Sequence, residues 1–133
     1  MTTEPLQADL PEFAWIWNHL QNHRTPRLHR RIARWLQQRV DGRDHRLVLM
    51  AFRGCGKSTL VGLFCAWWLH RDPSARILVL AAESSLAARM VRHTRRIIER
   101  HPFCAHLIPD GADAWAADRF TVRRDAAWRD PSM

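Results

Sequence analysis

The amino-acid sequence predicts an α/β fold in which helices flank a parallel β-sheet, for three reasons. Two continuous apolar runs, residues 47–52 and 77–82, have the composition of strands that are buried on both faces. A helical stretch follows each run, so strand and helix alternate along the chain as they do around a parallel sheet. A turn that contains glycine joins the first run to its helix, which is where such folds carry a phosphate-binding loop.

Composition and charge narrow the classes of function. Lys plus Arg number 21 and Asp plus Glu number 13, so the net charge is +8 with neutral histidines. This excess predicts a polyanionic partner such as a nucleic acid, a nucleotide or an anionic membrane face. An apolar content of 47% argues against a disordered chain, and 133 residues are enough for one domain.

The sequence also argues against membrane, secreted and metal-binding classes. The longest apolar runs fall far short of the roughly 20 residues that a bilayer span needs. The first residues carry acids and prolines instead of the basic start and apolar run of a signal peptide. Three cysteines without a C-x-x-C pair suggest neither a disulfide framework nor a zinc site. We therefore expect a cytosolic protein with no membrane part.

Two helices are predicted before the first strand. Apolar positions between residues 11 and 22 suit a short helix, which follows a polar arm. Thr25 is the expected N-cap of a second helix, with Pro26 at its first position. The second helix is expected to end near Asp41 and Gly42. Its apolar side recurs at three- and four-residue spacing and consists of Leu28, Ile32, Trp35, Leu36 and Val40.

Two more helices and one short strand are predicted further along. One helix extends over about 57–70 and is stopped by an Asp-Pro pair, and the other extends over about 84–100 and ends before a proline. Residues 120–122 suit a short strand. Trp67 and Trp68 are expected to lie in the core and not to act as platforms for stacked bases.

The turn after the first strand carries a phosphate-binding motif. Residues 51–58 are A-F-R-G-C-G-K-S, the Walker A pattern with alanine at its first position. A triphosphate must be wrapped by backbone N–H groups, and Gly54 and Gly56 allow that close approach. Lys57, the single lysine of the chain, is expected to reach the β- and γ-phosphates of ATP, and the Ser58 hydroxyl to ligate Mg²⁺.

The helix after the loop is expected to point its positive dipole end at the phosphates. Cys55 is expected to fill space in the loop and not to act as a nucleophile, because no base partner is visible. The residues predicted to hold the nucleotide are Ala51, Phe52, Arg53, Gly54, Cys55, Gly56, Lys57, Ser58 and Thr59.

Several pieces of the sequence resemble the N-terminal ATPase half of phage terminase large subunits, the motors that package viral DNA into procapsids. These pieces are residues 25–33 (T-P-R-L-H-R-R-I-A), 49–59 around the loop, 76–83, the arginine-rich stretch 84–100, and 115–122. The resemblance covers roughly residues 25–131. It implies a P-loop NTPase fold of the RecA-like (ASCE) type, with a sheet that is incomplete on its C-terminal side.

The resemblance also implies roles for individual residues. Terminase large subunits place an arginine inside the loop, where it supports charge on the γ-phosphate, and Arg53 matches that place. Arg53 and Lys57 are therefore the expected catalytic residues, although Arg53 pointing to solvent or pairing with an acid stays open. The upstream helix resembles the family's adenine-side segment, which makes Thr25, Pro26 and His29 candidates for base contacts. An ordinary helix start explains these three residues equally well.

The helix predicted over 84–100 carries a basic face. Arg89, Arg92, Arg96 and Arg100 fall opposite its apolar side at about 100° per residue. In a related motor this face would follow the phosphates of double-stranded DNA without reading its sequence. A solvated charged face explains the arginines equally well.

No Walker B strand that ends in aspartate follows residue 101, and Glu83 is interpreted as a strand-end residue. The acid-rich nuclease domain that terminases carry is absent as well. We therefore expect an arm and short helix over 1–24 and, over 25–133, the N-terminal part of an ATPase domain truncated before Walker B. Such a chain is expected to bind nucleotide weakly, to be marginally stable and to lack turnover. Robust ATPase activity of the purified chain would contradict this expectation.

The resemblance implies that the full-length relative couples ATP hydrolysis to DNA translocation in the cytoplasm of a host bacterium. Its partners would be double-stranded DNA, the terminase small subunit, the portal and the procapsid, and it would assemble as a ring. Other P-loop enzymes remain alternatives, such as part of a helicase or a small nucleotide kinase. A further alternative is a basic nucleic-acid-binding module without catalysis. That module would show salt-sensitive DNA binding that Lys57→Ala leaves unchanged.

Overall fold

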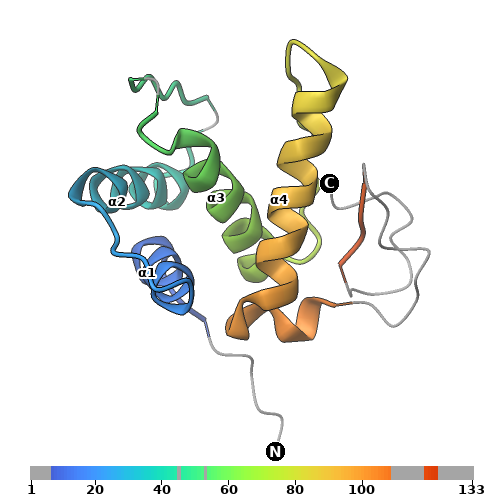
Figure 1. Cartoon of the computed structure of the whole chain (residues 1–133), viewed down its shortest axis with the longest axis horizontal. Helices are drawn as coiled ribbons and strands as arrows, with labels where there is room; N and C mark the ends of the chain where they lie inside the picture. The colour runs from blue at the N-terminus through green and yellow to red at the C-terminus, as the bar shows by residue number, and fades with distance from the viewer. Residues whose placement is uncertain (1–6, 45, 53, 109–118, 123–133) are drawn as a thin grey trace, which may run out of the picture.

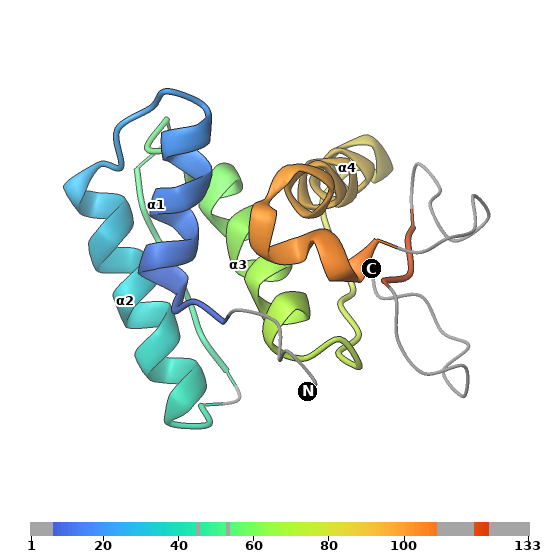
Figure 2. The same ribbon diagram turned by 90° about the horizontal axis from the view of Figure 1, so that it is seen from below.

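The computed structural model describes residues 7–44, 46–52, 54–108 and 119–122. Its regular elements are α1 (Leu10–Leu20), α2 (Arg27–Asp41), α3 (Lys57–Arg71), α4 (Ser84–Arg100) and the 3₁₀ helix η1 (Pro102–Leu107). Helix α3 occupies the middle of the molecule, with α1 and α2 on one side and α4 on the other (Figure 1). The view from below gives the same order and places η1 between the end of α4 and α3 (Figure 2).

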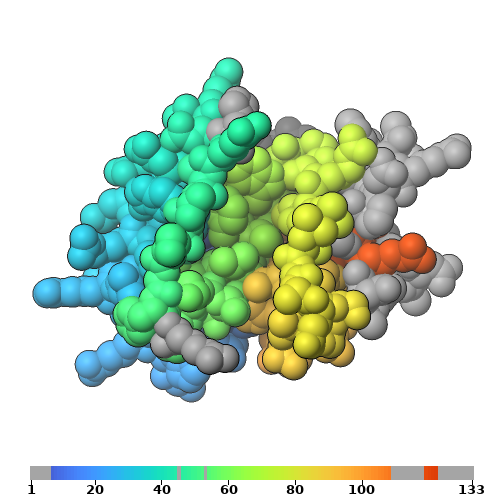
Figure 3. All heavy atoms as spheres, turned by 90° about the horizontal axis from the view of Figure 1, so that it is seen from above, coloured from blue at the N-terminus to red at the C-terminus, as the bar shows by residue number. Residues whose placement is uncertain are grey.

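The predicted P-loop NTPase fold of the RecA-like (ASCE) type, with its parallel sheet, is wrong for the described residues, because they form no β-strand and only an isolated β-bridge at Phe120. Residues 47–52 and 77–82 cross the same face of the molecule with α3 visible between them (Figure 3). Their outward side chains are exposed, to 78% at Val48, 89% at Met50, 81% at Leu78 and 85% at Leu80. An apolar run specifies a preference for extended backbone, but a strand forms only where a neighbour completes its hydrogen bonds.

Helix α1 begins one residue earlier and ends two residues earlier than predicted. The Asp9 carboxylate caps its start by accepting a hydrogen bond from the backbone N–H of Glu12 at 2.8 Å. Leu10, Phe13 and Ala14 are buried against the rest of the core. The apolar spacing therefore located this helix, and the cap set its first residue.

The expected N-cap of α2 is wrong by one residue. Pro26 occupies the cap position and makes no capping hydrogen bond with its side chain. The hydroxyl of Thr25 accepts a hydrogen bond from the side-chain amide of Asn18 at 3.1 Å, which ties α1 to the start of α2. The end of α2 at Asp41 and the burial of its apolar side agree with the prediction.

Helix α3 lies at the centre of the hydrophobic core. Leu60, Leu63 and Leu69 are fully buried along it, as is Trp67, whose indole N–H donates to the Ala8 carbonyl at 2.9 Å. The predicted core position of Trp67 is confirmed, and Trp68 is half-buried against the same cluster.

Helix α4 has the predicted bounds, and its apolar side is buried at Val91, Thr94, Ile97 and Ile98. The 3₁₀ helix η1 that follows was not predicted. The described helices contain none that is both long and apolar enough to cross a membrane.

Candidate phosphate-binding loop and basic groove

The loop between residues 51 and 57 adopts a backbone that requires glycine at two positions. Gly54 and Gly56 have φ values of +86° and +85°, a region that other residues rarely enter. A Cβ at Gly54 would meet no atom within 4 Å, so that side of the loop is open. The Cys55 N–H donates to the Phe52 carbonyl at 3.3 Å and closes a tight turn. The described loop is therefore a turned backbone with one open side.

Helix α3 begins directly after this turn. Its N-cap is Gly56, a residue without a side chain that could cap the N–H groups of the first turn. Uncapped N–H groups and the positive end of the helix dipole favour an anion at this position. Lys57 and Ser58 are the first two residues of α3, and the Ser58 side chain is exposed. The residues predicted to bind phosphate and Mg²⁺ thus lie together at one helix end.

The Lys57 ammonium donates to the Ala51 carbonyl at 2.5 Å, which joins the end of the loop to its beginning. The lysine is half-buried, and Thr59 beside it is half-buried too. Arg53, the expected charge-stabilising arginine, lies outside the described residues.

Two histidines from other helices contact the segment between Cys55 and Thr59. Nε2 of His29, on α2, lies 2.6 Å from the Cys55 carbonyl oxygen. Nε2 of His93, on α4, lies 3.4 Å from the Thr59 carbonyl oxygen. Burial lowers the pKa of His93, and the neighbouring Arg96 lowers it further, while the contact with Thr59 acts in the opposite direction.

Sequence reasoning missed His93. The signal that would have found it is Gly62, a glycine inside a helix, which often marks the close approach of another chain segment. A Cβ at Gly62 would lie 2.2 Å from Cδ2 of His93, so α3 and α4 approach closely at this pair. His29 was singled out from the sequence as a candidate for a base contact, whereas the structure places its ring on the loop backbone.

A groove of about 830 Å³ connects the start of α3 to the basic face of α4. Its polar lining consists of Ser58, Thr59, Arg89, Arg92, His93 and Arg96. The rest of its lining is apolar and comes largely from residues 77–81. Three of the four predicted arginines are therefore brought to the loop region. Arg100 is exposed on the same helix and does not line the groove.

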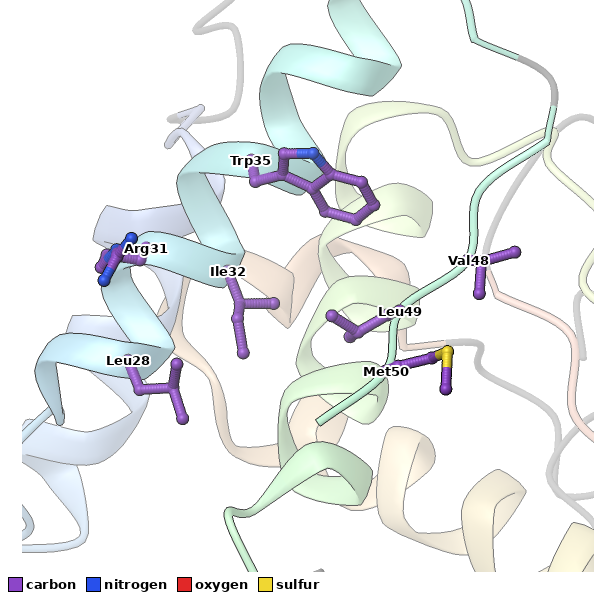
Figure 4. Close-up of a pocket in the computed structure, with 7 residues that line it drawn as sticks. All are labelled: Leu28, Arg31, Ile32, Trp35, Val48, Leu49 and Met50. Carbon is purple, nitrogen blue, oxygen red and sulfur yellow. The ribbon is translucent and has the colours of Figure 1, made fainter. Parts of the chain in front are cut away.

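A second, apolar pocket lies between α2 and the stretch that leads into the loop. Figure 4 shows its lining residues: Leu28, Arg31, Ile32, Trp35, Val48, Leu49 and Met50. Leu49 points toward α2, whereas Val48 and Met50 point to the other side of the chain (Figure 4). Leu49 thus packs this stretch against α2 just before the loop begins.

The remaining candidates differ in exposure. Cys55 is half-buried in the loop, whereas Cys65 and Cys104 are buried, and burial raises the pKa of each of these two thiols to about 12. Glu83 is exposed at the N-cap position of α4, where its carboxylate accepts a hydrogen bond from the Ser85 hydroxyl at 3.4 Å.

A sequence model of the family described as "RNA cytidine acetyltransferase NAT10/TcmA, helicase domain" matches residues 48–120, more than half of the chain. The chain belongs to this family. The matched span begins just before the loop and includes α3 and α4. The loop and the basic groove therefore lie in the part of the chain that carries the family match.

The chain is also 36% identical over 70 residues to the terminase large subunit of Enterobacteria phage T3. This alignment covers 53% of the chain and 12% of that protein. No solved structure matches the chain. The resemblance to terminase large subunits is confirmed, and the chain is related to P-loop ATPases. The division at residue 24 and the roles of the loop residues stay predictions.

Proposed function

We propose that the chain binds Mg²⁺-ATP at residues 51–59 and belongs to a terminase-like ATPase that acts on DNA. The observation that supports this most strongly is the geometry at the start of α3. Two glycines with positive φ lead into a helix whose N-cap, Gly56, has no side chain to cap it, and Lys57 and Ser58 occupy the first two helical positions. Backbone, dipole and side chains at this helix end all favour a phosphate group.

The side chains of the loop have distinct parts in this proposal. Lys57 exchanges the neutral Ala51 carbonyl for a phosphate oxygen, and a charged acceptor makes the stronger hydrogen bond. Ser58 offers its exposed hydroxyl to Mg²⁺. Arg53 and Thr59 complete the proposed nucleotide contacts. Mg²⁺-ATP supplies the phosphoanhydride bond whose hydrolysis drives motors of this type.

The groove extends the proposal to nucleic acid. Arg89, Arg92 and Arg96 form a cationic wall beside the start of α3. Such a wall suits a phosphate backbone and requires no base contacts. In a longer terminase-like protein the expected partners are double-stranded DNA, a small subunit, a portal and a procapsid. The proposal also includes a ring of subunits in the cytoplasm of a host bacterium.

A helicase-type ATPase is the second candidate, because the matching family model describes a helicase domain. Both candidates use the same loop, but they differ in the nucleic acid at the groove. Preference for duplex DNA over single-stranded RNA favours the terminase-like function, and the reverse preference favours the helicase-type function.

The nucleotide site is tested by titrating a non-hydrolysable Mg²⁺-ATP analogue into the wild type and Lys57→Ala. We expect saturable binding to the wild type and at least a tenfold weaker affinity in the variant, since one charge-assisted contact contributes about 1.5–3 kcal/mol. Arg46→Ala is the matched control, because Arg46 is an exposed cation before the loop. Equal affinity of all three proteins would refute the site.

The nucleic-acid part is tested by the salt dependence of duplex DNA binding. Replacing both Arg92 and Arg96 by alanine should flatten the slope of log K against log salt by about 2. The control is the double replacement of Arg30 and Arg34, which are exposed on α2. An unchanged slope in the α4 variant, or a larger effect of the α2 control, would show that the α4 face does not carry the contact.

A further inference from the structure

The ring of His29 lies directly against the outside of the loop. Its Nε2 is 2.6 Å from the Cys55 carbonyl oxygen, and a Cβ added to Gly56 would lie 2.8 Å from the same ring. A carbonyl oxygen only accepts, so Nε2 of His29 carries the hydrogen and donates it. His29 therefore forms a hydrogen bond to the peptide group between Cys55 and Gly56.

That contact sets the direction of a loop N–H. The peptide between Cys55 and Gly56 is trans, because the described residues contain no cis peptide. In a trans peptide the C=O and the following N–H point in opposite directions. Since His29 holds the Cys55 carbonyl toward α2, the Gly56 N–H points away from α2.

Helix α2 is a fixed support for this contact. The Gln37 side chain accepts a hydrogen bond from the Leu10 N–H at 2.5 Å, which joins α2 to α1. Asp41 at the end of α2 pairs with Arg71 at the end of α3 at 2.8 Å. These contacts join α2 to both neighbouring helices, and the buried side chains of Ile32 and Leu36 hold α2 in the core.

We propose that His29 is a positioning residue that braces the phosphate loop and keeps the Gly56 N–H directed away from α2, toward the nucleotide. This proposal rests on the proposed function of the loop as a nucleotide site, while the brace itself is a property of the protein without nucleotide. His29 acts through the loop backbone in this account and does not contact the phosphates.

The brace is measured through the reactivity of Cys55 toward the thiol reagent DTNB. Cys55 is the half-buried cysteine of the three, and burial of Cys65 and Cys104 raises their pKa and slows their reaction. A Cys55→Ser protein identifies the reaction phase that belongs to Cys55. His29→Phe keeps an aromatic ring but removes the N–H that donates to Cys55. His29→Gln keeps a side-chain N–H at a similar distance from the backbone. His23→Phe is the control, because His23 is exposed and precedes α2.

We expect His29→Phe to react with DTNB about two- to tenfold faster than the wild type, the change that loss of one hydrogen bond produces. His29→Gln should return the rate toward the wild-type value, and His23→Phe should not change it. A wild-type rate in His29→Phe would overturn the brace. Equal acceleration in His29→Phe and His29→Gln would also overturn it, because the donor would then be irrelevant.

The same proteins are then titrated with the Mg²⁺-ATP analogue. We expect His29→Phe to lose affinity by about two- to tenfold and His29→Gln to keep it. Unchanged affinity in a His29→Phe protein that reacts faster with DTNB would overturn the positioning role. If the wild type binds no analogue, the proposed function fails, and the DTNB rates still decide whether the brace exists.

Discussion

Gly54 and Gly56 share a positive φ but differ in their surroundings. Gly54 faces open space, whereas the ring of His29 fills the place where a Cβ of Gly56 would lie. An alanine at either position meets backbone strain of about 1–2 kcal/mol. At Gly56 it also displaces His29 and breaks the hydrogen bond to Cys55. Both positions therefore need glycine for the backbone, and only Gly56 also needs it to leave room for His29.

We predict that Gly56→Ala lowers the free energy of unfolding by about 0.5–1.5 kcal/mol more than Gly54→Ala, the net value of one hydrogen bond. Urea denaturation of both variants measures the difference. In a His29→Ala background the two substitutions should cost the same. A larger cost for Gly54→Ala in the wild-type background would contradict the described loop geometry.

At the scale of elements, the contact between α3 and α4 depends on Gly62. His93 of α4 occupies the space beside this glycine, and its Nε2 reaches the Thr59 carbonyl. Alanine is normally better than glycine inside a helix by about 1 kcal/mol. Here that gain is opposed by a Cβ that would lie 2.2 Å from the His93 ring.

We therefore predict that Gly62→Ala destabilises the wild type but stabilises a His93→Ala protein by about 1 kcal/mol. The measurement is a double-mutant cycle of unfolding free energies. Stabilisation of the wild type by Gly62→Ala would show that α3 and α4 do not approach closely here.

The helices were predictable because each has a strong local signal. Apolar spacing located α1 and α2, and the Asp-Pro pair and the later proline marked the ends of α3 and α4. The N-cap of α2 is Pro26 and not Thr25, and the sequence pattern alone could not show this. The Thr25 hydroxyl accepts a hydrogen bond from Asn18 of α1, a contact that only the folded structure shows. The predicted sheet is wrong because an apolar run does not determine which segment lies beside it, and a strand needs such a partner to form a sheet.

The candidate site was also predictable only where a local sequence motif marks it. The motif over 51–58 indicated the loop and its two glycines, and the structure gives both of them a positive φ. The contacts of His29 with the loop and of His93 with the start of α3 join residues 26 and 34 positions apart, respectively. Such long-range contacts leave no periodic signal in a single sequence.

For the molecule as a whole, a cluster of neutral histidines joins α1, α3 and η1. His101 stacks on Phe13 with ring centroids 3.8 Å apart, and its Nε2 donates to the Phe13 carbonyl at 3.0 Å. Burial lowers the pKa of His101 to about 4, against the effect of that hydrogen bond. Burial also lowers the pKa of His70 and of His106, and His106 lowers that of His70 further.

This cluster makes stability depend on pH. Histidines of the unfolded chain titrate near pH 6.5, so below that pH the unfolded state binds more protons than the folded state. The free energy of unfolding should therefore be fully retained above about pH 7 and should fall between about pH 6.5 and 4.

We predict that the urea midpoint drops between pH 7.5 and pH 5 and that His101→Gln reduces this drop. The control is His23→Gln, which makes the same chemical change on an exposed residue and should keep the drop. An equal midpoint at both pH values in the wild type would show that the histidine cluster does not control stability.

The central claim, that residues 51–59 bind nucleotide, is tested most directly by thermal melting with and without the Mg²⁺-ATP analogue. Ligand at 100-fold excess over Kd stabilises a folded protein by about 2.7 kcal/mol. We predict that the analogue raises the Tm of the wild type clearly more than that of Lys57→Ala, because a tenfold weaker affinity leaves the variant only about 1.4 kcal/mol of stabilisation at the same concentration, with both proteins melting cooperatively. An equal rise in both proteins, or no rise in a cooperatively melting wild type, would contradict the account.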